Sequence, residues 1–263
     1  MSDNDYMKLS GKVYLVTGGT QGLGEAIAMH LAELGAGGIC ICGRNAEAGR
    51  RVEQELSGKG TRALFVEADL SKVEDCRRVV ESCREHFGRV DGLVNAAATS
   101  ARGGIDDATP EAFDRMMALN VRAPFLLMQG CVEQMRRQGE GGAIVNILSI
   151  VAHGGPAKLT IYSASKGALL TMTKNLAHAL RHDRIRVYGL NIGWMATPGE
   201  HVVQKQEGAP DDWLEAADSQ APFGRILRPL DVARLVGFVI GRGGQMATGS
   251  IIDFDQMVIG AFD

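Results

Sequence analysis

The chain has 263 residues, which one α/β domain with a single large core accommodates, so we expect a single domain over residues 1–263. Its 28 lysines and arginines are balanced by 31 aspartates and glutamates, without a basic run long enough to follow a nucleic-acid backbone. The start, Met1 to Ser10, is polar, and no window reaches the ~20 apolar residues that span a bilayer. We therefore expect a cytoplasmic protein with neither nucleic-acid nor membrane partners.

Apolar, β-branched runs of strand length alternate with longer segments of helical period. The expected strands are Val13–Val16, Ile39–Cys42, Arg62–Val66, Gly92–Asn95, Ala143–Leu148, Arg186–Leu190 and Ser250–Phe254. The expected helices are Gly22–Leu34, Ala46–Ser57, Val73–Phe87, Pro110–Arg137, Ile161–Arg181 and Pro229–Ile240. Near-continuous apolar strands are buried on both faces, so the pattern predicts a Rossmann-like, doubly wound, seven-stranded parallel sheet with helices on both faces.

One segment interrupts this alternation. Residues 194–228 carry three prolines between the sixth strand and the last helix, which is typical of a lid or substrate loop. The five cysteines are an odd number without metal-ligand spacing, so they are expected to be reduced core thiols, with no metal site. They are Cys40, Cys42, Cys76, Cys83 and Cys131.

A glycine-rich run, Thr17 to Gly24, directly follows the first expected strand. Its glycines permit a tight turn, close approach of the backbone to a pyrophosphate, and packing of the next helix on the strand. The free N–H groups at the start of that helix favour phosphate oxygens. A turn without a ligand uses the same glycines, but the position after the first strand favours a dinucleotide. Within the run we expect cofactor contacts from Gly18, Thr20, Gln21, Gly22, Leu23 and Gly24.

The second strand ends in Gly43-Arg44-Asn45, without the acid that binds the ribose hydroxyls of NAD in dinucleotide folds. The planar guanidinium of Arg44 suits a 2′-phosphate, so Arg44 and Asn45 are expected at the cofactor and NADP is favoured over NAD. The alternative is that Arg44 stacks on the adenine or is solvated.

Two further loops follow strands on the same sheet edge. Asp69 is expected to accept a hydrogen bond from the adenine amino group with Leu70 beside the base, although Asp69 can equally cap the next helix. Asn95, Ala96 and Ala97 follow the fourth strand, and their small side chains let a cofactor lie close to the backbone.

Tyr162 and Lys166 are four residues apart in a helical pattern, hence on one helix face. A phenol with a pKa near 10 needs a nearby positive charge to act as an acid or base at neutral pH, and Lys166 and an oxidised nicotinamide both supply one. Ser149 ends the fifth strand, where its hydroxyl can polarise a substrate oxygen. Taken alone, such a Tyr/Lys pair is usually a surface pair; in this order with Ser149 and the glycines it is far more specific.

Together these motifs resemble the short-chain dehydrogenase/reductase family, in its ordinary single-domain form, over nearly the whole chain. The resemblance implies a catalytic tetrad of Asn120, Ser149, Tyr162 and Lys166. It implies that Tyr162 is the acid/base, and that Lys166 lowers its pKa and holds the nicotinamide ribose. It also implies that Ser149 orients the substrate oxygen and that Asn120 holds a water that links Lys166 to solvent.

The chain departs from the family pattern after the sixth strand, where Ile192 replaces the usual proline before Gly193. Thr197 is kept, so Gly193 and Thr197 are expected at the nicotinamide carboxamide. Relatives pair the helices that correspond to 110–137 and 161–181 here across a two-fold axis. The resemblance therefore implies a homotetramer or homodimer.

These residues predict an NAD(P)-dependent oxidoreductase that interconverts a secondary alcohol and a ketone, with a small-molecule substrate. Trp194, Glu200, His201 and Gln204 suit a sugar or polyol, since a ring face covers C–H groups and polar groups hold hydroxyls. The alternative is that Trp194 is lid core, together with Met195, and that His201 is solvated.

The sequence leaves two alternative functions open. A 3-oxoacyl-carrier-protein reductase needs a basic patch at the pocket mouth, where only Arg225 and Arg228 are candidates. A non-catalytic cofactor-binding regulator has no need of Tyr162 and Lys166 together.

Overall fold

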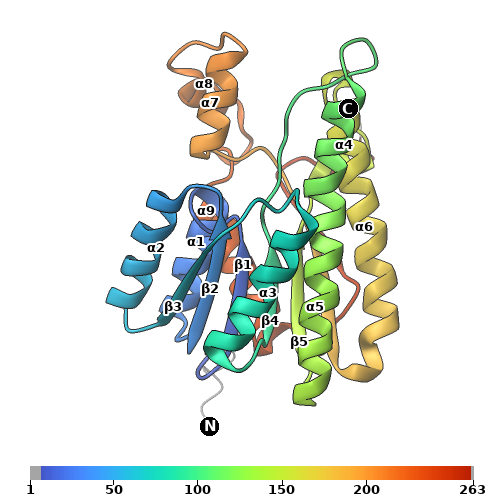
Figure 1. The fold of residues 1–263 in the computed structure, drawn as a ribbon. Coiled ribbons are helices and arrows are strands. Elements are labelled where there is room, and N and C mark those ends of the chain that lie inside the picture. The colour runs from blue at the N-terminus through green and yellow to red at the C-terminus, as the bar shows by residue number, and fades with distance from the viewer. Residues whose placement is uncertain (1–6, 262–263) are drawn as a thin grey trace.

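The computed structural model describes residues 7–261, and within them seven parallel strands form one sheet in the order β3-β2-β1-β4-β5-β6-β7 (Figure 1). The strands are β1 (Val13–Thr17), β2 (Gly38–Gly43), β3 (Arg62–Glu67), β4 (Gly92–Asn95), β5 (Gly142–Ile147), β6 (Ile185–Ile192) and β7 (Ile251–Phe254). The predicted seven-stranded parallel sheet is confirmed.

Helices cover both faces of the sheet. They are α1 (Gly22–Glu33), α2 (Ala46–Gly58), α3 (Val73–Phe87), α4 (Pro110–Met117), α5 (Ala123–Gln138), α6 (Thr160–Leu180), α7 (Pro198–Gln206), α8 (Trp213–Gln220) and α9 (Pro229–Ile240). Side chains of α3, α5 and α6 build the core on one face, and side chains of α1, α2 and α9 build it on the other.

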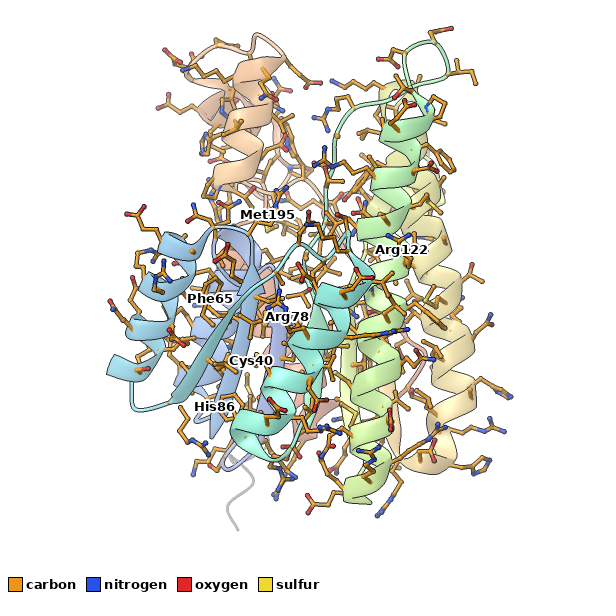
Figure 2. All side chains as sticks on the ribbon, in the orientation of Figure 1. Cys40, Phe65, Arg78, His86, Arg122 and Met195 are labelled. Carbon is orange, nitrogen blue, oxygen red and sulfur yellow. The ribbon has the colours of Figure 1, made fainter. Side chains whose placement is uncertain are left out.

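The burial of β1 shows why its sequence is apolar without alternation. Val13 and Leu15 point into the core beneath α3, α5 and α6, whereas Tyr14 and Val16 point into the core beneath α1 and α9. Successive side chains of a strand face opposite sides, so a strand covered on both faces needs apolar residues at every position. All five predicted core thiols are buried and unpaired; Figure 2 shows Cys40 within the sheet.

The helix predicted over 110–137 is interrupted. Between α4 and α5 lies a π-helical turn, Ala118–Arg122, which contains Asn120. Pro124 explains the break, because it has no N–H to donate to the carbonyl of Asn120 four residues earlier. Such π turns frequently occur at functional sites.

The 194–228 segment holds α7 and α8, which the sequence analysis did not predict. Figure 1 shows both helices, in orange, beyond one end of the strands and opposite the N-terminal end of the chain. Pro198, one of the three prolines that favoured a loop, occupies the first turn of α7, where the missing N–H of a proline costs nothing. No helix within residues 7–261 is long and apolar enough to cross a membrane.

Candidate active site

The glycine-rich turn lies at the carboxyl edge of the sheet, where the strand order reverses between β1 and β4. Gly18 and Gly22 have φ values of 66° and 58°, which favour glycine. A Cβ atom on Gly18 would lie 3.0 Å from the Cα of Ala97, and one on Gly24 would lie 2.3 Å from the carbonyl oxygen of Gly18. The turn therefore packs so closely that only glycine fits at these positions.

A cleft of about 320 Å³ opens in front of this turn. Gln21, the N-cap of α1, makes no side-chain cap, so the first amides of α1 stay available to a phosphate. Residues that follow six of the strands, β1 to β6, meet here, as the fold of a dinucleotide site requires. Of the predicted cofactor contacts, the cleft is lined by Gly18, Thr20, Gln21, Gly22, Leu23, Gly24, Arg44, Asp69, Leu70, Ala96, Ala97, Tyr162, Lys166 and Thr197.

Three predicted cofactor residues lie elsewhere. Asn45 is the N-cap of α2, where its Oδ1 accepts from the amide of Ala48 at 3.0 Å. Asn95 is buried between strands, and its Nδ2 donates to Oδ1 of Asn146 at 2.8 Å. Gly193 lines the neighbouring cavity instead. The sequence did not predict this hydrogen bond between Asn95 and Asn146, because the two residues are 51 positions apart.

At the outer end of the cleft, Arg44 is exposed, and no hydrogen bond or ion pair within residues 7–261 holds its guanidinium. Asp69 lies near it: hydrogen bonds from Ser71 lower the pKa of the Asp69 carboxyl most, and the charge of Arg44 adds to this effect. Oδ1 of Asp69 accepts from the amide and the hydroxyl of Ser71 at 3.0 and 2.8 Å. Asp69 is thus fixed by its own turn, and the N-cap of α3 is Lys72.

Asn120 is almost fully buried, and both Oδ1 and Nδ2 of its side chain form hydrogen bonds. Oδ1 accepts from the amide of Thr99 at 2.9 Å, and Nδ2 donates to the carbonyl of Thr99 at 2.9 Å and to the hydroxyl of Ser165 at 3.0 Å. The side chain therefore joins the loop after β4 to α6. A water-holding role would fall to its main-chain carbonyl, which Pro124 leaves without the usual helical donor.

Lys166 is buried beside Tyr162 on α6. Its Nζ donates to the carbonyl of Ile147 at 2.7 Å and lies 5.6 Å from the centroid of the Tyr162 ring. Burial lowers the pKa of the Lys166 amine to about 8. Burial raises the pKa of the Tyr162 phenol to about 12, and the hydrogen bond with the Ser149 hydroxyl acts in the opposite direction. In this protein without cofactor, burial therefore outweighs any lowering of the Tyr162 pKa by Lys166.

A second cavity, of about 950 Å³, adjoins the cofactor cleft. Ser149 lines it at the start of the 3-10 turn Ile150–His153, and Tyr162 and Thr197 line both hollows. Tyr162 consequently lies at the junction between a cleft shaped for a dinucleotide and a cavity of the size of a small-molecule site. The hydroxyl of Thr197 caps α7, accepting from the amide of Glu200 at 3.0 Å.

The 194–228 segment forms one wall of this cavity. Trp194 is half-exposed and stacks on Trp213 with 5.6 Å between ring centroids, while Trp213 is buried. Trp213 thus belongs to the core of the segment, whereas Trp194 faces the cavity. Figure 2 places Met195 where the segment joins the sheet. His201 is exposed but accepts from Nε1 of Trp213 at 3.2 Å, so it is not simply solvated.

Two charged clusters at this cavity were not predicted. Glu207, at the end of α7, accepts from Nε of Arg102 at 2.9 Å and from Nζ of Lys158 at 2.8 Å. These contacts lower the pKa of the Glu207 carboxyl to about 2. On the other side, Nδ2 of Asn191 donates to Oδ1 of Asp253 at 2.6 Å and lies 2.9 Å from Nε2 of His153. Sequence offers no signal for either cluster, because each joins residues about 40 to 100 positions apart.

Known proteins share this architecture over its full extent. The family model for short chain dehydrogenases matches residues 12–208. The chain belongs to the short-chain dehydrogenase family. An uncharacterized oxidoreductase from Thermotoga maritima is 35% identical over 249 residues, which cover 95% of this chain and 98% of the relative. The resemblance inferred from the motifs is confirmed, and this short-chain dehydrogenase is an NAD(P)-dependent dehydrogenase or reductase.

Two solved members of the family are similar in fold. The L-sorbose reductase of Gluconobacter frateurii, complexed with NADPH and L-sorbose, has a TM-score of 0.89 at 33% identity, covering 98% of this chain and 100% of that one. A 7α-hydroxysteroid dehydrogenase complexed with NADH has a TM-score of 0.89 at 26% identity, covering 100% of both chains. Relatives therefore use either nicotinamide cofactor, and the choice depends on residues particular to this chain.

Proposed function

We propose that this short-chain dehydrogenase interconverts a secondary alcohol and a ketone, with Tyr162 as the acid/base. The observation that carries the proposal is the position of Tyr162, which lines both the cofactor cleft and the larger cavity. A substrate in that cavity can reach the phenol and the cofactor together. Steady-state turnover of a panel of polyols and ketoses with NADP(H) and NAD(H) tests the proposal.

The other proposed catalytic residues position the substrate, the cofactor and the Tyr162 phenol. Ser149 orients the substrate oxygen by hydrogen bonding, next to the Tyr162 phenol. Lys166 holds the nicotinamide ribose and places a positive charge near the phenol. The main-chain carbonyl of Asn120 holds a water on the solvent side of Lys166, while its side chain fixes the loop after β4. When bound, the cofactor supplies or accepts the hydride, and its oxidised ring adds a positive charge.

The raised pKa of Tyr162 bears on the direction of proton transfer. A phenol with a pKa of about 12 is protonated at neutral pH, so it is ready to donate a proton to the oxygen of a ketone. To accept a proton from an alcohol, the phenol must first become more acidic. That change requires positive charge close to the ring, which Lys166 provides only in part.

We propose a preference for NADP. Arg44 lies at the adenine end of the cleft, no partner among residues 7–261 occupies its guanidinium, and the tip of β2 carries no acid. A fork of N–H donors in this place suits a 2′-phosphate. The NADPH complex of the L-sorbose reductase agrees with this preference, although the NADH complex of the steroid dehydrogenase shows that the fold alone does not impose it.

The proposed substrate is a sugar or polyol, and residues 194–228 are its lid. Trp194 offers a ring face to C–H groups, and Glu200 and Gln204 offer polar atoms to hydroxyls. The similarity to an L-sorbose reductase supports this class of substrate. Glu207 attaches the lid to the loop of Arg102 and to Lys158 across the cavity mouth.

The carrier-protein alternative finds little support at the cavity mouth. Both guanidiniums that were candidates for a basic patch are already neutralised by carboxylates. Arg225 forms a two-point ion pair with Asp231 at 2.6 and 2.9 Å, and Arg228 pairs with Asp218. An acidic carrier protein would have to displace these acids.

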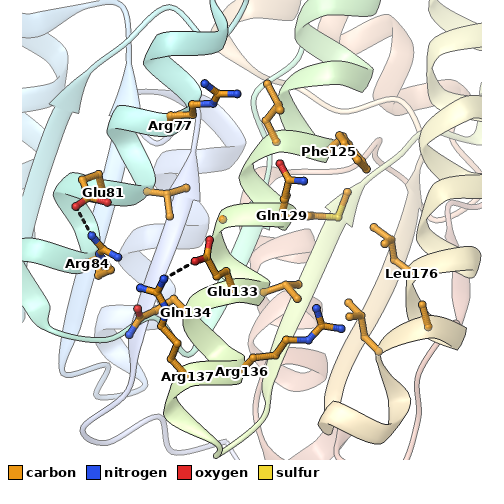
Figure 3. A pocket seen from close by; sticks show the side chains of 17 residues that line it. Arg77, Glu81, Arg84, Phe125, Gln129, Glu133, Gln134, Arg136, Arg137 and Leu176 are labelled. Atoms are coloured by element: carbon orange, nitrogen blue, oxygen red, sulfur yellow. Dashed lines mark hydrogen bonds and ion pairs between the residues drawn. The ribbon is translucent and has the colours of Figure 1, made fainter.

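We also propose that the chain forms a homodimer or homotetramer through α5 and α6. A groove of about 830 Å³ runs along α3, α5 and α6, and Figure 3 shows it with Phe125 and Leu176 on its wall. Phe125 is 43% exposed although it is a large apolar side chain. A partner copy would bury it. We further propose that residues 1–263 form a single domain. The location that we propose is the cytoplasm, where unpaired thiols persist.

A further inference from the structure

Glu200 is held in one orientation at the wall of the substrate cavity. It lies in the first turn of α7, where its amide donates to the hydroxyl of Thr197 at 3.0 Å. Its Oε1 accepts from Nε1 of Trp194 at 2.8 Å and from Nε2 of Gln204 at 2.7 Å. Two donors on one carboxylate oxygen fix the carboxylate, so it is preorganised rather than free to rotate.

The second oxygen of this carboxylate is unused. Within residues 7–261, Oε2 of Glu200 has no hydrogen-bond donor, and no lysine, arginine or histidine forms an ion pair with Glu200. Its neighbour Glu207 differs, because Arg102 and Lys158 both pair with it. Glu200 therefore presents an unused acceptor to the cavity, and the charge of Arg102 attracts it without forming an ion pair.

This acceptor acts close to the reacting atoms. Burial raises the pKa of the Tyr162 phenol most, and the negative charge of Glu200 raises it further. The positive charge of Arg102 lowers it. The other charged or titratable side chains at the cavity wall come from four different elements, and they are Arg102, His153, Lys158 and Glu207. Of these, Glu207 is paired with two cations, and His153 lies 3.3 Å from the carboxylate of Asp253. Among the described residues, Glu200 is the cavity carboxylate with which no cation forms an ion pair.

We propose that Oε2 of Glu200 accepts a hydrogen bond from a substrate hydroxyl on the carbon next to the reacting one. The inference rests on the proposed function and names the substrate class of that site: vicinal diols and their hydroxyketones. A carboxylate acceptor selects a hydroxyl over a methyl group, because a methyl group displaces water from the carboxylate oxygen without replacing its hydrogen bond. The same charge repels substrates that carry a carboxylate at that position.

The test uses four alcohols with the same skeleton, which differ only in the group beside the reacting carbon: propylene glycol, sec-butanol, isopropanolamine and lactate. With NADP, wild-type kcat/KM for propylene glycol should exceed that for sec-butanol by about tenfold to over a hundredfold, as expected for a hydrogen bond to a charged group. Lactate should be the poorest substrate. Faster turnover of isopropanolamine than of propylene glycol would overturn the assignment to a hydroxyl.

Glu200→Gln keeps an oxygen for Trp194 and Gln204 but places an amide donor at Oε2. This variant should lose the preference, so that the ratio of kcat/KM for propylene glycol to kcat/KM for sec-butanol falls to about one. The control is Glu215→Gln on α8, an exposed acid away from the cavity, which should change neither value. An unchanged preference in Glu200→Gln would overturn the proposal.

A second readout needs no turnover. The ultraviolet absorbance of the protein without cofactor reports tyrosine ionisation, and Tyr162→Phe identifies the transition that belongs to Tyr162. Glu200→Gln should move that transition to lower pH, because it removes a negative charge near the phenol. An unmoved transition would contradict the placement of Glu200.

The two proposals fail in different ways. If no alcohol of the series is oxidised by the wild type, the proposed function fails for this substrate class. Binding of propylene glycol to the protein with NADP, followed by NMR line broadening, then decides the inference. Wild type should bind at least about tenfold more tightly than Glu200→Gln. Equal binding would overturn the role of Glu200.

Discussion

The amine of Lys166 lies 5.6 Å from the centre of the Tyr162 ring and is anchored to the carbonyl of Ile147 at the end of β5. The backbone of the sheet thus fixes the position of a buried cation next to a half-buried phenol. Burial favours the neutral form of both groups. It lowers the pKa of Lys166 to about 8 and raises the pKa of Tyr162 to about 12. The Tyr162 phenol is therefore protonated at neutral pH and can donate a proton.

Lys166→Ala should weaken both turnover and cofactor binding, because the amine is expected to touch the ribose as well as to influence the phenol. In the wild type, the cation is lost as pH rises through about 8, so kcat/KM for ketone reduction should be level near neutral pH and fall above it. Stopped-flow pH profiles and cofactor titrations measure both effects. Unchanged cofactor affinity in Lys166→Ala would remove its role at the ribose.

Arg44→Ala should reduce NADP binding by about tenfold to over a hundredfold, since a charge-assisted two-point contact is worth roughly 1.5–3 kcal/mol. NAD binding should change little, and the preference for NADP should shrink at high salt. Fluorescence titration with both cofactors measures this. If the wild type binds NAD at least as well as NADP, Arg44 stacks on the adenine or is solvated.

A complementary substitution, Gly43→Asp, is unsuitable as a test. It would add a ribose acceptor, but a Cβ atom at Gly43 would lie 2.7 Å from Cγ2 of Thr20, in the cofactor turn itself. Arg44→Asp introduces the acid without that collision and should favour NAD.

Glu207→Gln should loosen the proposed lid from neutral to mildly acidic pH. The pKa of Glu207 is lowered to about 2, so its ion pairs contribute above the ordinary glutamate pKa and are lost only as pH falls below it. Limited proteolysis within residues 194–228 should thus be constant in the wild type from neutral to mildly acidic pH and faster in Glu207→Gln. Glu215→Gln is the control. Equal cleavage of all three proteins would refute the proposal that the ion pairs of Glu207 hold the lid in place.

Phe125→Glu should dissociate the proposed assembly by placing a charge on the α5 surface. Light scattering should show a dimer or tetramer for the wild type at micromolar concentration and a smaller species for the variant. Ile105→Glu changes a residue that is 90% exposed in the loop before α4 and serves as the control. A monomeric wild type would refute the proposal.

The fold and most of the site were predictable because their signals are local. The glycine turn, Arg44, Asp69 and the pair of Tyr162 and Lys166 each follow from short motifs next to strand ends. The π turn at Asn120 was missed, although Pro124 in the middle of the predicted 110–137 helix is a sequence signal for such a break. The contacts of Asn120 with Thr99 and Ser165 join distant segments and could not be predicted.

Contacts between distant segments could not be predicted. Glu207 meets Arg102 across 105 residues, and nothing in either local sequence indicates the pairing. The helices of the 194–228 segment are only eight or nine residues long, too short for periodicity to separate them from a loop. Trp213 is buried in the core of these helices, whereas Trp194 is exposed. The sequence alone does not indicate which of the two rings is buried.

The most direct test of the central claim is turnover by Tyr162→Phe, measured with the best ketose or polyol found for the wild type, together with cofactor affinity. The variant removes one hydroxyl and little contact area, so turnover should fall by ~10²-fold or more while the cofactor binds nearly as before. A variant that keeps even about a tenth of the wild-type rate would contradict the role of Tyr162 as acid/base and, with it, the proposed mechanism.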